Sequence, residues 1–286
     1  MPAALALLRP HQWVKNLLVF TALITSHRWD QPAAVLAALQ QFAAFCLAAS
    51  AVYAVNDVID READAAHPSK RHRPVAAGAI APGTALAIGA VLMLAAFAIA
   101  WPLGADAFGA LGVYALLAVG YCVVLKRLLW IDVLALAALY VLRVIAGAWA
   151  IAVEPSPWLL AFAGFLFLSL ASLKRYGDLR QHAGAGLPGR AYQPGDEAPV
   201  LAIGAATGVV AVLVLALYVN SPDVRVLYAE PAWIWLLCPL LLYWLARLWT
   251  IAARAKLDAD PIVFALRDGA SWAVAIGFVV LIALAL

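Results

Sequence analysis

The sequence has few charged residues: Asp, Glu, Lys and Arg make up 12% of its 286 residues, whereas hydrophobic residues make up 66%. Typical soluble domains are about 25% charged and about 45–50% apolar. This composition excludes an ordinary soluble domain, and the mean hydropathy of +0.94 indicates an integral membrane protein. The net charge of +3 comes from basic residues spread over several loops, so no basic stripe suggests a nucleic-acid partner.

Cysteine is also scarce. Cys46, Cys122 and Cys238 each lie inside an apolar segment, and their spacing is not that of metal ligands. We expect three unpaired thiols that pack as small hydrophobic side chains.

The apolar residues form long unbroken runs, which favours helices over a barrel, whose strands would alternate. Each run is close to the ~20 residues that a helix needs to cross a bilayer. We therefore expect an all-α polytopic bundle of about nine transmembrane helices, forming a single domain over residues 1–286. The predicted spans are 12–28, 33–56, 84–101, 107–125, 130–152, 157–173, 199–220, 230–249 and 268–286.

The basic residues predict the orientation. Only Arg28 and Arg225 fall on one side of the predicted membrane, and Arg143 lies within a span, whereas the other Lys and Arg fall on the opposite side. By the positive-inside rule, the N-terminus and the long loops after the second and sixth spans are cytoplasmic. The expected location is the inner (plasma) membrane.

The densest charged cluster follows the second span. Asp57, Asp60 and Asp64 are separated by three and four residues, which places them on one face if the helix continues. Like charges so close together repel unless a cation lies among them, and Mg²⁺ prefers carboxylate oxygens. Lys70 and Arg73 follow and can contact an anion. Solvated surface charge is the ordinary alternative, but ionisable groups near membrane depth tend to be functional, so the pattern favours a metal-bound diphosphate.

A second charged segment lies after the sixth span and contains Lys174, Arg175, Tyr176 and Asp178, with Arg190 further along. Arginine binds phosphate bidentately and lysine binds it as a point charge. An ordinary positive-inside anchor would explain the basic residues but not the aspartate and tyrosine, so this segment also predicts phosphate binding.

Two other basic sites remain open. Near Tyr121, Lys126 could extend its charge to the interface or contact a phosphate. Arg143 lies about eleven residues into its span, where a charged side chain needs a partner. Its role could be structural or catalytic.

The acidic cluster carries a family resemblance. The run Asn56-Asp57-x-x-Asp60-x-x-x-Asp64, with Lys70-x-x-Arg73-Pro74-x-x-x-Gly78 after it, resembles the first aspartate motif of the UbiA superfamily of intramembrane prenyltransferases. The resemblance implies nine helices and an active site at the cytoplasmic face.

The second segment resembles one branch of that superfamily. Typical members carry a second aspartate-rich motif, whereas this chain has Lys174-Arg175-Tyr176-x-Asp178. That segment is similar to the decaprenyl-phosphate phosphoribosyltransferase branch, as are Arg9-Pro10-x-Gln12-Trp13-x-Lys15-Asn16, the run from Tyr121 to Asp132, and Arg143-Val144-Ile145-Ala146-Gly147.

The branch implies that 5-phosphoribose passes from 5-phosphoribosyl 1-diphosphate to polyprenyl (decaprenyl) phosphate in the membrane lipid, with Mg²⁺ as cofactor and diphosphate as leaving group. The product would be a precursor for arabinan in cell-wall biogenesis. Whether the chain forms a homo-oligomer is left open by the sequence. The expected catalytic residues are Asp60, Asp64 and Lys174, and the expected metal ligands are Asp57, Asp60 and Asp64. The expected substrate-binding residues are Lys15, Asn56, Lys70, Arg73, Tyr121, Lys126, Arg175, Tyr176, Asp178 and Arg190.

Two alternatives remain. A UbiA-type prenyltransferase acting on a prenyl diphosphate and an aromatic or lipid acceptor would need a second acidic pair, for which Asp196 and Glu197 are the adjacent candidates. An anionic-lipid transporter would use charges at the membrane midplane, whereas the charges here gather at one face.

Overall fold

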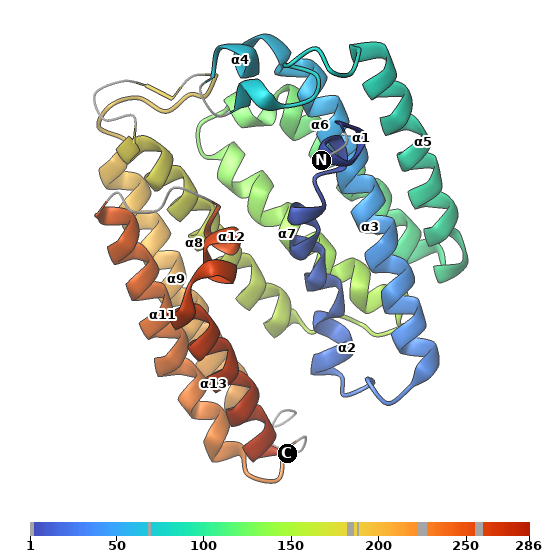
Figure 1. The fold of residues 1–286 in the computed structure, drawn as a ribbon. Coiled ribbons are helices and arrows are strands. Elements are labelled where there is room, and N and C mark those ends of the chain that lie inside the picture. Colours follow the sequence, from blue (N-terminus) through green and yellow to red (C-terminus); the bar gives the residue numbers. More distant parts are fainter. Residues whose placement is uncertain (1–2, 68–69, 182–185, 188, 222–227, 255–259) are drawn as a thin grey trace. The chain divides into compact units, whose positions relative to one another are not determined.

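The computed structural model describes residues 3–67, 70–181, 186–187, 189–221, 228–254 and 260–286, and these residues form helices and their connections (Figure 1). By its internal contacts the chain divides into two compact units. Unit 1 comprises Met1–Lys126 and Leu139–Pro155, and unit 2 comprises Arg127–Ala138 and Ser156–Leu286. The prediction of a single domain stays a prediction.

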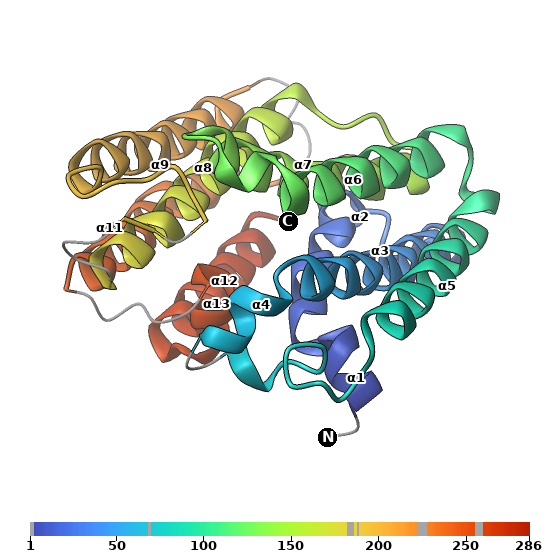
Figure 2. The same ribbon diagram turned by 90° about the horizontal axis from the view of Figure 1, so that it is seen from above.

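Unit 1 is built around a long, alanine-rich helix, α3, which packs against α5, α6 and the 3₁₀ helix η1. Figures 1 and 2 both show α5 alongside α3. The small side chains permit this close packing: a Cβ added at Gly89 of α5 would lie 3.2 Å from the Ala51 carbonyl oxygen. The elements are α1 (Ala3–Leu8), η1 (Pro10–Phe20), α2 (Thr21–Thr25), α3 (Pro32–Ile59), α4 (Arg61–Ala66), η2 (Lys70–His72), α5 (Pro82–Ala100), η3 (Trp101–Leu103), α6 (Ala105–Val123), η4 (Leu125–Arg127) and α7 (Ile131–Ala150). Arg127 and the first part of α7, up to Ala138, belong to unit 2.

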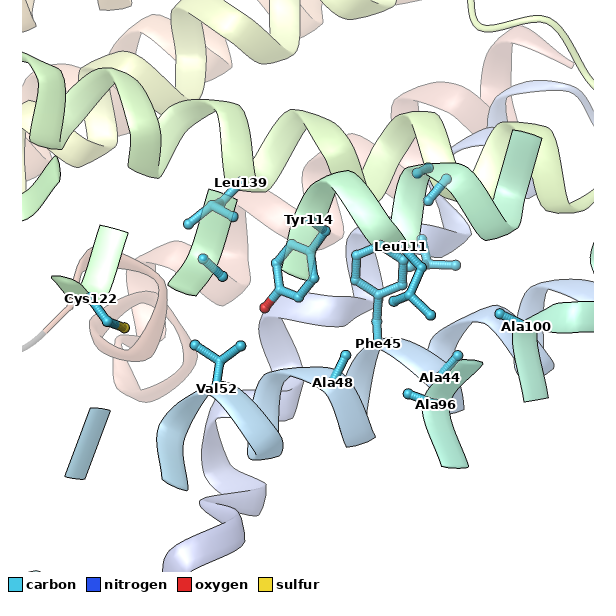
Figure 3. Packing of buried hydrophobic residues seen from close by; sticks show 14 residues of the cluster. Ala44, Phe45, Ala48, Val52, Ala96, Ala100, Leu111, Tyr114, Cys122 and Leu139 are labelled. Atoms are coloured by element: carbon cyan, nitrogen blue, oxygen red, sulfur yellow. The ribbon is translucent and has the colours of Figure 1, made fainter. Parts of the chain in front are cut away.

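The main hydrophobic core of unit 1 is formed by buried residues of α3, α5, α6 and α7. Figure 3 shows Phe45 of α3 beside Tyr114 of α6, with ring centroids 4.8 Å apart. Around this pair lie small side chains such as Ala48, and Leu111 is fully buried beside them. Large rings among alanines fill the space between closely spaced helices, including α3, which leads to the acidic cluster.

Unit 2 is centred on the packing of α8 against α9, with α11 packed on both. The approach is close at Gly204 of α9, where an added Cβ would lie 2.6 Å from the Ser172 side chain and 2.5 Å from that of Trp249. Small residues at such crossings are typical of membrane helices. The elements are α8 (Pro157–Gln181), α9 (Glu197–Val219), η5 (Pro231–Leu236), α11 (Leu237–Ala253), α12 (Pro261–Arg267) and α13 (Gly269–Ala285).

Seven helices of the described chain are long and apolar enough to cross a membrane, and the bent pair α12–α13 raises this number to eight if it is one span. They correspond to the second to eighth predicted spans, and α13 matches the ninth. The structure therefore confirms a helical, multi-pass membrane protein but not the count of nine. The three thiols, Cys46, Cys122 and Cys238, are free and buried, as expected.

The first predicted span differs most from expectation. Residues 12–28 do not form one regular helix: η1 covers Pro10–Phe20, and the short α2 follows. A 3₁₀ run of eleven residues is unusual and needs support from its surroundings. Trp13 supplies part of it by donating to Ser50 Oγ at 3.0 Å, and the backbone at Val19 packs directly onto Gly147.

Candidate functional site

The acidic cluster of unit 1 lies at a break between two helices. Helix α3 ends at Ile59, α4 begins at Arg61, and Asp60 lies between them. Figure 1 shows the two helices. The expectation of one continuous helical face through all three aspartates is therefore wrong. The Asp60 amide still donates to the Asn56 carbonyl at 2.9 Å, so the hydrogen bonding of α3 extends to the residue at the break. Aspartate suits such a terminal position better than a helix interior.

Two arginines hold the buried part of the cluster. Arg9 donates to Asp57 Oδ1, and Arg73 Nη1 lies 3.6 Å from the same oxygen and 2.5 Å from Asp64 Oδ2. Asp57 is 1% exposed and Asp64 is 3% exposed. Arg73 thus links the carboxylates of α3 and α4, which the sequence placed seven residues apart.

Asp60 has a different partner. Lys126, which lies in η4, donates from Nζ to both of its carboxylate oxygens, at 2.6 and 2.8 Å. Lys126 is 9% exposed, so its ammonium is withdrawn from solvent onto the carboxylate. This contact favours a role for Lys126 in the acidic cluster over a lysine that merely extends to the interface.

The buried carboxylates suit a cation. Asp57 Oδ2 is buried and accepts no hydrogen bond. A buried acceptor without a partner is costly, and Mg²⁺ typically binds through one or two carboxylates together with substrate phosphates. The described part of the chain contains no group of three acidic, histidine or cysteine side chains close enough to share a metal ion. Joint ligation by Asp57, Asp60 and Asp64 therefore stays a prediction, whereas the Asp57–Asp64 pair has suitable chemistry.

Four other predicted residues also belong to unit 1: Lys15 in η1, Asn56 in α3, Lys70 in η2 and Tyr121 in α6. Lys70 is exposed, and the other three are half-buried. Their roles in binding substrate stay predictions.

Arg9 was not among the predicted site residues, although it is the first residue of a family-like run. Its backbone has φ of 50°, a left-handed conformation that is unfavourable for any residue with a Cβ. Its guanidinium lies 5.0 Å from the centre of the Tyr53 ring. Burial, followed by the charge of Arg73, lowers the pKa of Arg9, while Asp57 opposes this effect. The sequence signal for Arg9 was its position just before Pro10.

The polar cluster of unit 2 is centred on Asp132 in the first turn of α7. Its Oδ2 accepts from Arg175 Nε at 2.8 Å and lies 3.4 Å from Arg190 Nη1. Its Oδ1 accepts from the Tyr192 hydroxyl at 2.7 Å and from the Val133 amide at 2.7 Å. Sequence reasoning noted Asp132 only within a family-like run and did not identify it as a site residue.

The residues predicted on α8 separate into two arrangements. Helix α8 continues to Gln181, eight residues beyond the predicted end of its span. Arg175 is fully buried and pairs with both Asp132 and Asp178, the latter at 2.7 Å. Lys174 is half-exposed, with Nζ 3.6 Å from Asp260. Tyr176 packs on Trp249, with ring centroids 5.8 Å apart, and is buried as part of the core.

Tyr192 was also missed. Its side chain is 2% exposed, and the Arg175 guanidinium lies 5.4 Å from the centre of its ring. Burial raises the pKa of Tyr192 above its usual range, and the hydrogen bond to Asp132 and the charge of that carboxylate raise it further. The phenol therefore stays protonated and donates to the carboxylate. No motif in the sequence connected it with Asp132, which lies sixty residues earlier.

Arg143 has neutral partners. Its Nε donates to Asn16 Oδ1 at 2.8 Å, its Nη1 to the Leu139 carbonyl at 2.5 Å and its Nη2 to the Tyr114 hydroxyl at 3.0 Å. The contact with Asn16 ties α7 to η1. These bonds satisfy the buried guanidinium within unit 1, which favours the structural reading of this residue.

Comparison with protein families gives a match to the UbiA prenyltransferase family over residues 17–275. Among curated proteins, the uncharacterized protein y4nM of Sinorhizobium fredii is 38% identical over 93% of this chain and 52% of its own length. Nodulation protein NoeC of Azorhizobium caulinodans is 34% identical over 92% of this chain and 86% of its own.

The decaprenyl-phosphate phosphoribosyltransferase of Corynebacterium glutamicum is 38% identical over 63% of this chain and 55% of its own. The chain thus spans about half the length of y4nM and of this transferase. Among solved structures, a UbiA homolog from Archaeoglobus fulgidus bound to GPP and Mg²⁺ aligns with a TM-score of 0.73 at 20% identity, covering 98% of this chain and 99% of that one. This likeness shows that the fold is shared.

Proposed function

This chain belongs to the UbiA prenyltransferase family, and we propose that it transfers 5-phosphoribose from 5-phosphoribosyl 1-diphosphate to a polyprenyl phosphate. The observation that carries the proposal is the asymmetry of its charged clusters. Unit 1 holds an acidic cluster with the chemistry of a metal–diphosphate site, while the corresponding segment on α8 is basic and offers no second acidic metal motif. The similarity to decaprenyl-phosphate phosphoribosyltransferases supports this reading.

The proposed reaction is a substitution at C1 of the ribose. An anionic oxygen of the polyprenyl phosphate forms the new bond to C1, the bond from C1 to the diphosphate oxygen breaks, and the diphosphate leaves with the bonding electrons. C1 passes through an oxocarbenium-like state. Since the attacking oxygen is already anionic, no strong general base is required, and catalysis depends on positioning and charge neutralisation.

The acidic cluster would act on the leaving group. Asp57, Asp60 and Asp64 would hold Mg²⁺, which would neutralise charge on the departing diphosphate. Arg73 and Lys126 already lie on these carboxylates, at 2.5 and 2.6 Å. They would exchange a carboxylate for a phosphate oxygen when substrate binds, because both contacts are charge-assisted. On α8, Lys174 is the half-exposed cation and would contact the 5-phosphate.

The chain would act in the inner membrane, with the connections after α3 and α8 on the cytoplasmic side, where a soluble sugar diphosphate is available. The lipid product would serve as a precursor of the arabinosyl donor for cell-envelope arabinan.

A product assay tests the proposal. Purified protein is incubated with ¹⁴C-labelled phosphoribosyl diphosphate, Mg²⁺ and polyprenyl phosphates of several lengths, and the label is followed into the organic phase. We expect a labelled lipid that releases ribose 5-phosphate on mild acid treatment. Transfer of a prenyl group from geranyl diphosphate to an aromatic acceptor, with no labelled lipid, would instead identify a conventional UbiA prenyltransferase.

A further inference from the structure

Asp132 joins three separate parts of unit 2. It lies in the first turn of α7, is fully buried, and bonds to Arg175 of α8 and to Tyr192 and Arg190 in the connection between α8 and α9. Three side-chain donors, from Arg175, Arg190 and Tyr192, meet at a single carboxylate, which also accepts its neighbour's amide. A buried carboxylate is costly unless its oxygens are paired, and here both are.

Arg175 has little capacity left for a substrate. Its side chain is 0% exposed, and Asp132 and Asp178 both lie 2.7 Å from its guanidinium. A phosphate would have to displace Asp132, which is fully buried, or Asp178, which is 37% exposed, and a displaced Asp132 would lose a buried partner. The role of Arg175 in binding substrate directly stays a prediction, while its contacts with Asp132 and Asp178 are those of a residue that orders its neighbours.

The connection after α8 is anchored at Tyr192. The Leu187 amide donates to the Tyr192 carbonyl at 3.2 Å, and the Arg190 amide donates to the Leu187 carbonyl at 3.1 Å. Gly189 has φ of 71° within this turn, a conformation that glycine adopts without strain. With Tyr192 buried on Asp132, the turn is closed, and Arg190 remains 24% exposed at its tip.

We propose that Asp132 is a positioning residue: through Tyr192 and Arg175 it fixes residues 187 and 189–192 of the connection after α8, so that Arg190 is held where its exposed part can contact the phosphate of the sugar donor. The inference rests on the proposed function for the identity of the ligand, but the ordering of the turn does not depend on it.

Tyr192→Phe is the cleanest test, because it removes a single hydroxyl while keeping the buried ring. Tyr243→Phe is the matched control, since Tyr243 is exposed on α11 in the same unit. Trypsin cleavage after Arg190, quantified by mass spectrometry on the folded protein in detergent, reports the order of the turn. We expect cleavage about ten- to hundredfold faster in Tyr192→Phe than in wild type, because one hydrogen bond to a charged group is lost, and unchanged cleavage in Tyr243→Phe. Equal rates in all three proteins would overturn the proposal.

Kinetics provide the second readout. Tyr192→Phe should raise the KM for phosphoribosyl diphosphate about fivefold, leaving the KM for polyprenyl phosphate and kcat near wild type. Asp132→Asn should show a larger effect of the same kind, and Asp132→Glu should recover part of it, because it restores a carboxylate. A loosened turn with an unchanged donor KM would overturn the positioning role. If wild type has no phosphoribosyl transfer, the proposed function fails, and the cleavage rates alone decide whether Asp132 orders the turn.

Discussion

Arg73 and Asp64 form an ion pair that crosses from the segment after η2 to α4, with Nη1 2.5 Å from Oδ2. The same guanidinium nitrogen lies 3.6 Å from Asp57. One arginine thus contacts both of the carboxylates that we propose as metal ligands. In the free protein, Arg73 compensates the charge of these buried carboxylates. In the substrate-bound protein, the metal ion would do so instead, so the carboxylates would not be left unpaired in either state.

The acidic cluster should be essential for turnover. Asp60→Ala and Asp64→Ala should each abolish product formation while the protein remains inserted and folded, because loss of a metal ligand removes several kcal/mol of leaving-group stabilisation. Asp30→Asn is the control, as Asp30 is exposed outside the cluster. Near-wild-type activity of either variant at saturating Mg²⁺ would contradict the metal assignment.

Arg9 should contribute to stability through Asp57. Arg9→Ala leaves a carboxylate that is 1% exposed with only the more distant Arg73, so we expect a loss of roughly 2–3 kcal/mol, measured by unfolding in detergent. Adding Asp57→Asn should restore part of this loss, because the unpaired charge is then removed. Arg28→Ala is the control, since Arg28 donates to the Ile151 backbone carbonyl. Equal losses for Arg9→Ala and Arg28→Ala would contradict the ion-pair argument.

Lys174 and Arg175 are neighbours in sequence but should behave differently. Lys174→Ala should raise the donor KM about ten- to hundredfold, since a charge-assisted phosphate contact is worth about 1.5–3 kcal/mol, and it should affect the lipid KM much less. Arg175→Ala should lower the thermal stability instead, because Asp132 then loses its buried partner. The KM values for donor and lipid, together with a melting curve for each variant, test whether Lys174 binds the donor and Arg175 stabilises the fold. A loss confined to the lipid KM would assign Lys174 to the acceptor.

Much of the fold could be predicted because the membrane restricts the alternatives. Long apolar runs can only be helices there, so the second to eighth spans were located within a few residues, apart from the extension of α8. The first segment could not be predicted, because its 3₁₀ geometry depends on Ser50, Arg143 and Gly147, which are distant in sequence.

The sequence identified the residue types of the candidate site better than it identified which of those residues contact one another. Spacing identified Asp57, Asp60 and Asp64, but helical periodicity could not show that the helix breaks at Asp60. Helical periodicity also could not show that Arg175 pairs with Asp132, since that pairing joins positions forty-three residues apart. Charge patterns indicate which groups gather at a membrane face, whereas burial decides which of them remain available to a ligand.

The proposed orientation can be tested by cysteine labelling. His72→Cys in η2 and Asp30→Cys before α3 introduce thiols at exposed positions beyond opposite ends of α3, and the three native cysteines are buried. An impermeant maleimide should label His72→Cys only when it has access to the cytoplasm, and Asp30→Cys only from the opposite side. The reverse pattern would contradict the orientation that the basic residues predict.

The close contact between α7 and η1 gives the sharpest prediction on folding. An added Cβ at Gly147 would lie 1.9 Å from the Val19 carbonyl oxygen, a distance that only backbone movement could relieve. Gly147→Ala should therefore separate η1 from α7 and weaken the bond between Arg143 and Asn16, so that the protein melts well below wild type or fails to accumulate. Gly109→Ala in α6 is the control, because no atom lies within 4 Å of its added Cβ, and alanine should favour that helix by up to ~1 kcal/mol. Similar melting temperatures for the two variants would show that η1 is not held against α7 at this point.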